Sequence, residues 1–473
     1  MMSVSTHRSA ATFESSEIGG CVTASPWISP LVRYAELDAP FAWRKGTTVT
    51  VRHFLSAVWR LAARLPSKRH VINLCNDRYY FAVGFGAALV RRQISLLPTC
   101  RAAEPLQQLS HEYEDVYVLA DHADVPSGLS TFAFPEDVQR VAPAPHNPLI
   151  SIHQLAAIVF TSGSSGCPQA HAKRWGSLIQ GAHALRRQFD LGRKKASIAV
   201  GTVPAQHMYG LETTIMLPLQ CGWGIHAGMP ILPADIMADI EQIDLPVWLM
   251  TTPVHLRAYM GQGAVLTGLE GIISATMPLT ASLAQDVERS WSAPVYEIYG
   301  CTEGGIIASR RTVDGKWWQL CDGLNIRQNG EETWVSGGHV GTALKLTDRI
   351  VVGDDRTLDL LGSSYDLVKV AGKRASLAAL NNALTRISGV VDGTFFWPDQ
   401  GRTGTGRLSA FIVAPGISRS RILGELRKRI DPVFLPRPLY LVDALPRNTT
   451  GKLPRERLEA FANRLKSCPS VRG

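Results

Sequence analysis

A run of hydroxyl and glycine residues is the first candidate for chemistry in this chain. It directly follows the apolar stretch Leu155 to Phe160 and reads Thr161, Ser162, Gly163, Ser164, Ser165, Gly166. Glycine lets the backbone approach a ligand closely, and N–H and hydroxyl groups can surround a polyphosphate. The GxxxxGK[ST] pattern of a Walker A loop is absent. The run predicts a phosphate-binding loop, with a flexible surface turn as the alternative.

A second segment follows the short apolar stretch Val295 to Ile298. It reads Tyr299, Gly300, Cys301, Thr302, Glu303, Gly304, Gly305. An aromatic ring, a hydroxyl and a carboxylate at a strand end could stack on a base, bond a phosphate and hold Mg²⁺, which favours carboxylate and phosphate oxygens together. A plain strand-ending turn is the alternative.

A third segment near the end of the chain carries a lysine. Leu445 to Leu453 reads LPRNTTGKL, which places Lys452 after a Thr-Thr-Gly turn on an exposed loop. Taken alone, this segment predicts no more than a solvated lysine.

The hydrophobic pattern places these segments among the elements of a parallel α/β sheet. Apolar strands alternate with segments of helical spacing, as is typical of βαβ units. The predicted strands are His70 to Cys75, Gln93 to Leu97, Leu155 to Phe160, Ser197 to Val203, Val247 to Thr251 and Gly271 to Ser274, and the helices are Val51 to Leu65, Phe81 to Val90 and Gly176 to Phe189. Short strands with turn signals between Gly305 and Val352 predict a β-rich subdomain. A compact mixed segment follows Tyr365 and ends in a helix near Arg455 to Leu465.

Composition indicates an ordinary globular protein of more than one domain. The chain has 473 residues, of which 45% are hydrophobic and 19% charged. The net charge of +9 is spread along the chain, without zinc-finger spacing or a basic arm, which argues against a nucleic-acid binder. We expect no transmembrane segment, because no uncharged apolar stretch is long enough, and no signal peptide. Eight scattered cysteines without a CxxC pair favour reduced thiols and a cytoplasmic location.

In this order and spacing, the three segments resemble motifs of the ANL superfamily of adenylate-forming enzymes, which includes acyl- and aryl-CoA synthetases, nonribosomal adenylation domains and beetle luciferases. They are similar to its TSGSTGxPK, YGxTE and PRxxxGKxxR motifs. Further stretches resemble its PLFHxxG, TGD…GRxDDxIK and GxR segments, and they lie at 204–210, 346–348 with 362–369, and 372–374. A narrower resemblance, at 167–178 and 307–312, is to bacterial members of aryl-polyene and xanthomonadin-type pigment biosynthesis, which are thought to load an acid onto an acyl carrier protein.

The resemblance implies an α/β fold. A large N-terminal adenylation domain at 1–364 would hold two α/β subdomains and a small β-rich subdomain. A small mobile α+β lid domain at 365–473 would carry the catalytic lysine. The implied reaction is ATP-dependent activation of a carboxylic acid to an acyl-adenylate, followed by transfer to a thiol.

The resemblance also implies roles for single residues, with ATP and Mg²⁺ as cofactors. Lys452 would bridge the attacking carboxylate and the α-phosphate. The loop Thr161 to Gly166 would hold the β- and γ-phosphates. The remaining roles are Tyr299 and Gly300 at adenine, Thr302 at the α-phosphate, Glu303 at Mg²⁺, Asp348 at the ribose, and Gly372 in a thiol tunnel.

The implied acid pocket lacks the carboxylate that pairs an amino group in nonribosomal enzymes, because 206–209 reads QHMY. A free α-amino acid is therefore disfavoured. His207 and Tyr209 would suit an aromatic or hydroxylated ring, with packing under the pocket floor as the alternative. The acid could also be a medium-chain acyl acid.

Four positions depart from the family pattern: Gln169 for the loop lysine, Ser363 for the arginine of GRxDD, Tyr365 at the hinge, and Ala275-Thr276-Met277 for Gly-Gly-Ala. Lys173 is a candidate substitute for the lost loop cation. We expect transfer to an acyl carrier protein, which a positive surface would suit. The alternatives are a CoA synthetase that uses free CoA and a degenerate, non-catalytic nucleotide-binding protein.

Overall fold

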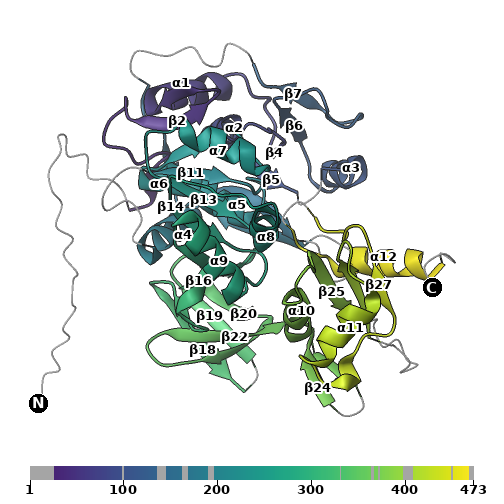
Figure 1. Cartoon of the computed structure of the whole chain (residues 1–473). Coiled ribbons are helices and arrows are strands. Elements are labelled where there is room, and N and C mark those ends of the chain that lie inside the picture. The colour runs from purple at the N-terminus through teal and green to yellow at the C-terminus, as the bar shows by residue number, and fades with distance from the viewer. Residues whose placement is uncertain are drawn as a thin grey trace, which may run out of the picture.

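The computed structural model describes residues 26–98, 101–135, 145–161, 169–189, 197–330, 332–363, 367–370, 373–397, 408–448 and 451–467. Two long sheets with helices packed on them account for most of the described chain up to residue 363. A smaller α+β unit, made of residues 367–467, lies beside them (Figure 1). This is the mixed α/β architecture that the sequence predicted.

The first long sheet has six strands and is parallel except at one edge. In spatial order its strands are β10 (Gln169–Arg174), β9 (Leu155–Thr161), β5 (Ile94–Leu97), β4 (His70–Asn73), β6 (Val116–Ala120) and β7 (Thr131–Ala133). β10 pairs with β9 antiparallel, while the other neighbours run parallel. A separate two-stranded ladder joins β1 (Ile28–Pro30) and β8 (Leu149–Ser151).

The second long sheet has eleven strands with a parallel centre. Its order is β21 (Asp348–Val352), β22 (Thr357–Ser363), β17 (Trp318–Leu320), β16 (Gly305–Arg311), β15 (Val295–Cys301), β14 (Leu269–Ser274), β13 (Val247–Thr251), β11 (Ile198–Gly201), β12 (Gly224–His226), β2 (Pro40–Arg44) and β3 (Thr47–Thr50). The neighbours from β15 to β2 run parallel, and the pairs at both ends are antiparallel.

The remaining strands form three small sheets. One joins β18 (Leu324–Asn329), β19 (Glu332–Gly337) and β20 (Gly341–Leu346). The α+β unit holds the other two, β23 (Leu367–Val370) with β24 (Lys373–Ser376), and β25 (Asp392–Phe396) with β26 (Ser409–Val413) and β27 (Leu439–Leu441). The region predicted to be β-rich is so, but three of its strands, β16, β17 and β21, belong to the eleven-stranded sheet, and only β18 to β20 form a sheet of their own.

The helices lie between the strands. Up to residue 363 they are α1 (Val51–Ala62), α2 (Arg78–Val90), α3 (Ala103–Glu112), α4 (Trp175–Gln188), α5 (Met208–Leu211), the π-helical turn η2 (Glu212–Met216), α6 (Leu217–Cys221), α7 (Pro233–Glu241), α8 (Pro253–Gly261), α9 (Ala281–Trp291) and the 3₁₀ turn η3 (Thr312–Asp314). The α+β unit adds α10 (Leu377–Thr385), α11 (Arg419–Arg427), the 3₁₀ turn η5 (Pro432–Phe434) and α12 (Arg455–Ser467).

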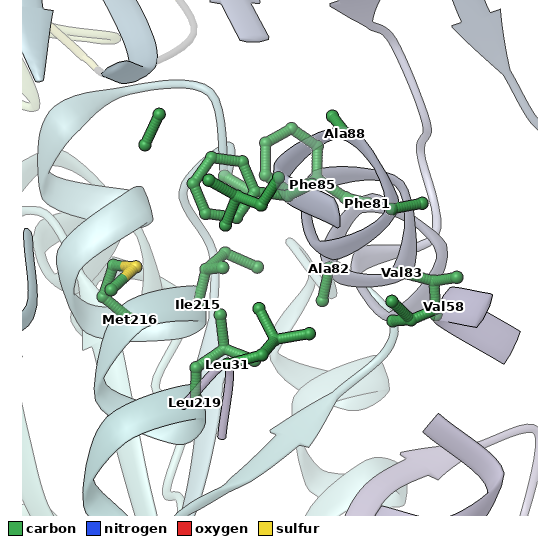
Figure 2. Close-up of a cluster of buried hydrophobic side chains, with 14 of the residues drawn as sticks. Leu31, Val58, Phe81, Ala82, Val83, Phe85, Ala88, Ile215, Met216 and Leu219 are labelled. Atoms are coloured by element: carbon green, nitrogen blue, oxygen red, sulfur yellow. The ribbon is translucent and has the colours of Figure 1, made fainter. Parts of the chain in front are cut away.

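A large apolar core fixes η2, a turn that matters for the site below. Figure 2 shows side chains of α2, among them Phe81 and Phe85, facing Ile215, Met216 and Leu219 of η2 and α6. All five side chains are buried. Burial of an aliphatic or aromatic side chain of this size contributes about 1.5–3 kcal/mol, so the core holds η2 firmly.

The predicted strands and helices are present, with ends shifted by a few residues, and further elements that were not predicted lie between them, among them β6, β12 and α7 to α9. One of the elements that were not predicted, β10, bears directly on the site. β10 lies between the hydroxyl-rich run and α4, where the sequence pattern suggested a loop that leads straight into the helix. Its side chains are mostly exposed and polar, so it lacks the apolar signal of a buried strand.

Two further sequence-based expectations concern described residues. No helix in these ranges has the length and apolarity needed to cross a membrane. Four cysteines that the structure describes, Cys75, Cys221, Cys301 and Cys321, are free thiols.

Candidate active site

The hairpin of β9 and β10 carries the start of the predicted phosphate loop. Thr161 ends β9 and pairs with Gln169 of β10, whereas Ser162 to Gly166 lie outside the described residues. The Thr161 hydroxyl lies 3.2 Å from Nε2 of His171 on β10. The hairpin thus anchors one end of the loop to an imidazole that the sequence motifs had not singled out.

The second motif forms the tight turn between β15 and β16. Gly300 pairs with Ile306, and a Cβ at Gly300 would lie 2.4 Å from the carbonyl oxygen of Gly305. Only glycine permits this approach. The turn is closed further by the Gly304 N–H, which donates to Cys301 Sγ at 3.3 Å. Thr302 therefore occupies a sharply bent segment at the end of a central strand.

Two residues of β10 tie this turn to the hairpin. Nζ of Lys173 donates to the backbone oxygen of Glu303 at 2.6 Å, and Nε2 of His171 lies 3.6 Å from Glu303 Oε1. Lys173 is buried, and this burial lowers its pKa against the raising effect of nearby Glu212, Cys301 and Glu303. Its ammonium group therefore bonds the turn that carries Glu303, and the phosphate role suggested for Lys173 by the sequence stays a prediction.

Tyr299 and Asp348 meet at one edge of the turn. The Tyr299 hydroxyl donates to Asp348 Oδ2 at 2.8 Å, and the Tyr299 ring packs edge-on near Trp318 with centroids 6.1 Å apart. Burial, followed by the charge of Asp348, raises the pKa of Tyr299 well above its ordinary value. The residues assigned to adenine and to ribose are thus neighbours.

The loop that carries Lys452 is held by an arginine from the same motif. Arg447 forms two hydrogen bonds of 2.7 Å with the Asp392 carboxylate and donates to the Gly451 backbone oxygen at 2.8 Å. It also donates to Met277 Sδ at 3.4 Å, in the connection between β14 and α9. These contacts set the position of the exposed Lys452.

Lys452 and the first two motifs converge on one cavity of about 320 Å³. Its lining includes Thr161, Gly300, Thr302, His207 and Lys452. These residues come from β9, β15 with its turn, the start of α5 and the C-terminal loop, which are distant in sequence. Tyr299 and Glu303 are sequence neighbours of the lining residues Gly300 and Thr302, and Asp348 bonds Tyr299, but none of the three lines the cavity. Gly372 lies outside the described residues.

The two residues predicted for the acid pocket line the same cavity, with different consequences. Burial, with the charges of Lys452 and Arg101, lowers the pKa of His207 to about 4, so its imidazole is neutral at physiological pH. The Tyr209 hydroxyl donates to the backbone oxygens of Ile273 at 2.7 Å and Thr251 at 3.2 Å. The Tyr209 hydroxyl is therefore engaged by the sheet, and its ring offers an apolar wall.

A buried carboxyl in this cavity was missed by the sequence motifs. Glu212 begins η2, lines the cavity and is 5% exposed. The only sequence signal was a lone acidic residue in an apolar stretch, five positions after His207. A buried carboxyl in a cleft is a feature of functional sites.

The arrangement suits chemistry on a phosphate ester next to an apolar acid pocket. A cation, a hydroxyl and a bent backbone segment at one end of a cavity can stabilise charge that develops on phosphate oxygens. Glu303 offers a single carboxylate beside Thr302, which fits Mg²⁺ bound largely through phosphate oxygens and water. Within the described residues no cluster of three or more His, Cys, Asp or Glu side chains could hold a metal by itself.

Comparison with known proteins agrees with this geometry. A family model described as AMP-binding enzyme matches residues 57–364, more than half of the 473-residue chain. The chain is 27% identical over 301 residues to a 4-coumarate–CoA ligase of Rhodobacter capsulatus, which covers 63% of this chain and 74% of that ligase.

Solved structures share the fold. An anthranilate CoA ligase in complex with anthranoyl-AMP matches with a TM-score of 0.74 at 16% identity, over 93% of this chain and 99% of that chain. The o-succinylbenzoate coenzyme A synthetase of Bacillus subtilis, in complex with ATP and a magnesium ion, matches with a TM-score of 0.74 at 16% identity, over 89% and 97%.

Proposed function

This chain belongs to the family of AMP-binding enzymes, and on that premise we propose that it activates an aryl carboxylic acid with ATP and then passes the acyl group to a thiol. The observation that carries the proposal is the convergence of Thr161, Thr302 and Lys452 on one cavity. The 4-coumarate and anthranilate ligases among the similar proteins support an aryl acid.

In the first half-reaction a carboxylate oxygen attacks the α-phosphorus of ATP, and pyrophosphate leaves. Lys452, as a compact point charge, would neutralise charge shared by the attacking carboxylate and the α-phosphate. Thr302 would donate to an α-phosphate oxygen, and Thr161 with the following Ser162 to Gly166 would hold the β- and γ-phosphates. Fixed donors of this kind stabilise the transition state more than a strong base would.

Further residues would orient the nucleotide. We assign Tyr299 and Gly300 to the adenine and Asp348 to the ribose hydroxyls. Glu303 would hold Mg²⁺, which when bound offsets negative charge on the phosphates. His171 and Lys173, which contact the Glu303 side chain and backbone, would keep that carboxylate in place.

We divide the chain functionally into an adenylation domain at 1–364 and a lid at 365–473. The apolar cores support the division, since two core clusters draw only on residues between Val368 and Leu465, and the other four only on residues up to Leu360. In the second half-reaction the thiol would attack the acyl-adenylate carbonyl, the acyl–phosphate bond would break and AMP would leave. A turn of the lid before this step would remove Lys452 and bring Gly372 to a thiol tunnel. Movements of lids and domains complete the catalytic site and gate single steps in many enzymes.

For the acceptor we propose the phosphopantetheine thiol of an acyl carrier protein, in pigment or aryl-polyene synthesis in the cytoplasm. The net charge of +9 suits an acidic protein partner. Free CoA is the second candidate, favoured by the CoA ligases among the similar proteins.

The test is acid-dependent exchange of labelled pyrophosphate into ATP, measured with benzoates, cinnamates and fatty acids. We expect exchange with at least one aryl acid. Lack of exchange with every acid would favour the degenerate nucleotide-binding alternative, to which the departures at Gln169 and Ser363 point. Supplying free CoA or a carrier protein as acceptor to the active enzyme then identifies the thiol.

A further inference from the structure

A buried carboxyl group stands at the inner wall of the active cavity without a role in the phosphate chemistry. Glu212 is 5% exposed and lines the cavity together with Met208 and Ile306. The core shown in Figure 2, to which Ile215 and Met216 of the same turn belong, holds its backbone. π-helical turns such as η2 occur frequently at functional sites.

Two glycines leave the space that the carboxyl occupies. A Cβ at Gly305 would lie 2.4 Å from Glu212 Oε1, and a Cβ at Gly181 would lie 3.1 Å from it. Gly305 also has a φ of +75°, which favours glycine. The surrounding chain is therefore compatible with a carboxyl at this point.

Only one of the two carboxyl oxygens is used by the described part of the protein. Oε1 accepts a hydrogen bond from the Ile306 N–H at 3.3 Å. Among the described residues, Oε2 has neither a hydrogen bond nor an ion pair within 4 Å, and the ammonium of the nearby Lys173 donates to the Glu303 backbone oxygen. This oxygen keeps some exposed surface, and since Glu212 lines the cavity, a ligand bound there can donate a hydrogen bond to it.

The raised pKa of the Glu212 carboxyl is consistent with a hydrogen-bond acceptor that a bound ligand would complete. Burial raises the pKa of Glu212 to about 7, and Lys173 and the Ile306 N–H oppose that rise. A hydrogen bond donated by a ligand would favour the carboxylate form.

Part of the cavity wall is apolar. Val159, Phe160, Ile298, Ile306 and Met208 line it, and Met208 and Ile306 adjoin Glu212. Such a slot accepts a flat hydrocarbon ring, and one polar group at its inner end fixes which ring enters.

We propose that Glu212 is a specificity-determining residue that accepts a hydrogen bond from a hydroxyl or amino group at the end of the acid remote from its carboxylate. The inference rests on the proposed function and names its substrate class, an aromatic acid with such a donor opposite the reacting group.

The separation of His207 and Glu212 along the chain fits an acid with a single aromatic ring. His207, which caps the start of α5, and Glu212, the first residue of η2, are five positions apart, a rise of about 7.5 Å at 1.5 Å per residue. Lys452 is close enough to His207 for its charge to affect that imidazole. A benzoate with its carboxylate at the Lys452 end and a para donor at Glu212 spans about this length.

A purely structural role for Glu212 is the competing explanation. Its Oε1 could serve only to hold the start of β16 through the Ile306 N–H. Glu212→Gln separates the two roles, because the amide oxygen can still accept from Ile306 while its NH₂ group replaces the acceptor that faces the cavity. Glu212→Leu removes both.

The experiment compares 4-hydroxybenzoate and 4-aminobenzoate with benzoate and 4-methoxybenzoate, which lack the donor. Pyrophosphate exchange and acid binding by calorimetry are measured on the full chain. The variants are Glu212→Gln, Glu212→Leu and, as a matched control, Glu297→Gln, a buried carboxyl whose bonds go to Arg310, Thr312 and the Leu279 N–H.

We expect the wild type to favour the donor acids, and both Glu212 variants to lower that preference about 10- to 100-fold, the value of a hydrogen bond to a charged group. Glu297→Gln keeps the wild-type preference. Equal binding of 4-hydroxybenzoate and benzoate by the wild type, or an unchanged preference in Glu212→Gln, overturns the inference. Absence of pyrophosphate exchange with every acid contradicts the proposed function instead. In that case the calorimetric binding of the same acids still decides the role of Glu212.

Discussion

The Tyr299 hydroxyl donates a 2.8 Å hydrogen bond to Asp348 Oδ2, which joins residues 49 positions apart. Tyr299 lies near the end of a central strand of the long sheet, and Asp348 begins its edge strand β21. The phenol therefore orients the carboxylate that we assign to the ribose, and one bond couples the two halves of the nucleoside site.

Tyr299→Phe should raise the KM for ATP about fivefold with little change in kcat, because the ring remains and about 1 kcal/mol of orienting hydrogen bond is lost. Pyrophosphate exchange at varied ATP measures it. Tyr296→Phe, on the same strand, is the control, since the Tyr296 hydroxyl has no hydrogen bond among the described residues. An unchanged KM in Tyr299→Phe would show that Asp348 is not used in nucleotide binding.

Lys452→Ala should lower acid-dependent pyrophosphate exchange by about 100-fold or more, as expected on removal of a charge that stabilises the transition state. Transfer to the thiol from a supplied acyl-adenylate should be spared, since the proposed mechanism gives Lys452 no part in that step. Lys428→Ala, which removes an exposed lysine paired with Glu425, should leave both half-reactions as in the wild type. Equal loss of both half-reactions in Lys452→Ala contradicts the division of labour.

Gly210→Ala should destabilise the protein by roughly 3 kcal/mol, because its Cβ would lie 2.0 Å from the Pro204 backbone oxygen. The cavity wall that begins at His207 would shift with it. Gly424→Ala is the matched control: Gly424 lies in α11, and an added methyl group there would meet open space, so alanine should stabilise by roughly 0.5–1 kcal/mol. Urea unfolding measures both, and a loss in Gly210→Ala no larger than the experimental error would argue against the close contact.

The stability of the wild type relative to Glu212→Gln should fall as the pH rises from about 4.5 to about 7. The pKa of Glu212 is raised from 4.5 to about 7 in the folded chain, so the folded state holds a proton that the unfolded state has released. The contribution of protonated Glu212 to the free energy of unfolding is fully present below pH 4.5 and is lost as the pH approaches 7. The free energy of unfolding changes by about 3 kcal/mol at most over this range.

The measurement is the difference in free energy of unfolding between the two proteins at pH 5, 6, 7 and 8. His207, whose folded pKa is lowered to about 4, acts in the opposite sense by destabilising the fold as the pH falls below 6.5. It is present in both proteins, so the difference isolates Glu212. A difference that is constant with pH would contradict the raised pKa.

The strand and helix pattern could be predicted wherever burial leaves a periodic signal. β9 and α4 are examples, since their apolar residues are those that the core requires. β10 gives no such signal: it is an edge strand whose pairing with β9 is made by the backbone and is nearly independent of side-chain type.

The candidate site could be predicted only as far as its motifs reach. Thr302 and Lys452 stand in recognisable patterns, and both line the cavity. Glu212 could not be found in this way, because its importance depends on space left by Gly181 and Gly305 in the folded chain. The use of Lys173 to bond the Glu303 backbone is likewise a tertiary contact that no local pattern encodes.

The bonds that Arg447 makes around the Lys452 loop have a mechanical consequence. Asp392 and Gly451, like Arg447 itself, belong to the C-terminal unit, and of these bonds only the one to Met277 reaches outside it, to the connection between β14 and α9. A rotation of that unit would break this weak thioether contact and leave the bonds of Arg447 to Asp392 and Gly451 intact. The loop that carries Lys452 would then keep its conformation while it leaves the cavity and returns to it. Each catalytic cycle would therefore avoid the entropy cost of ordering this loop again.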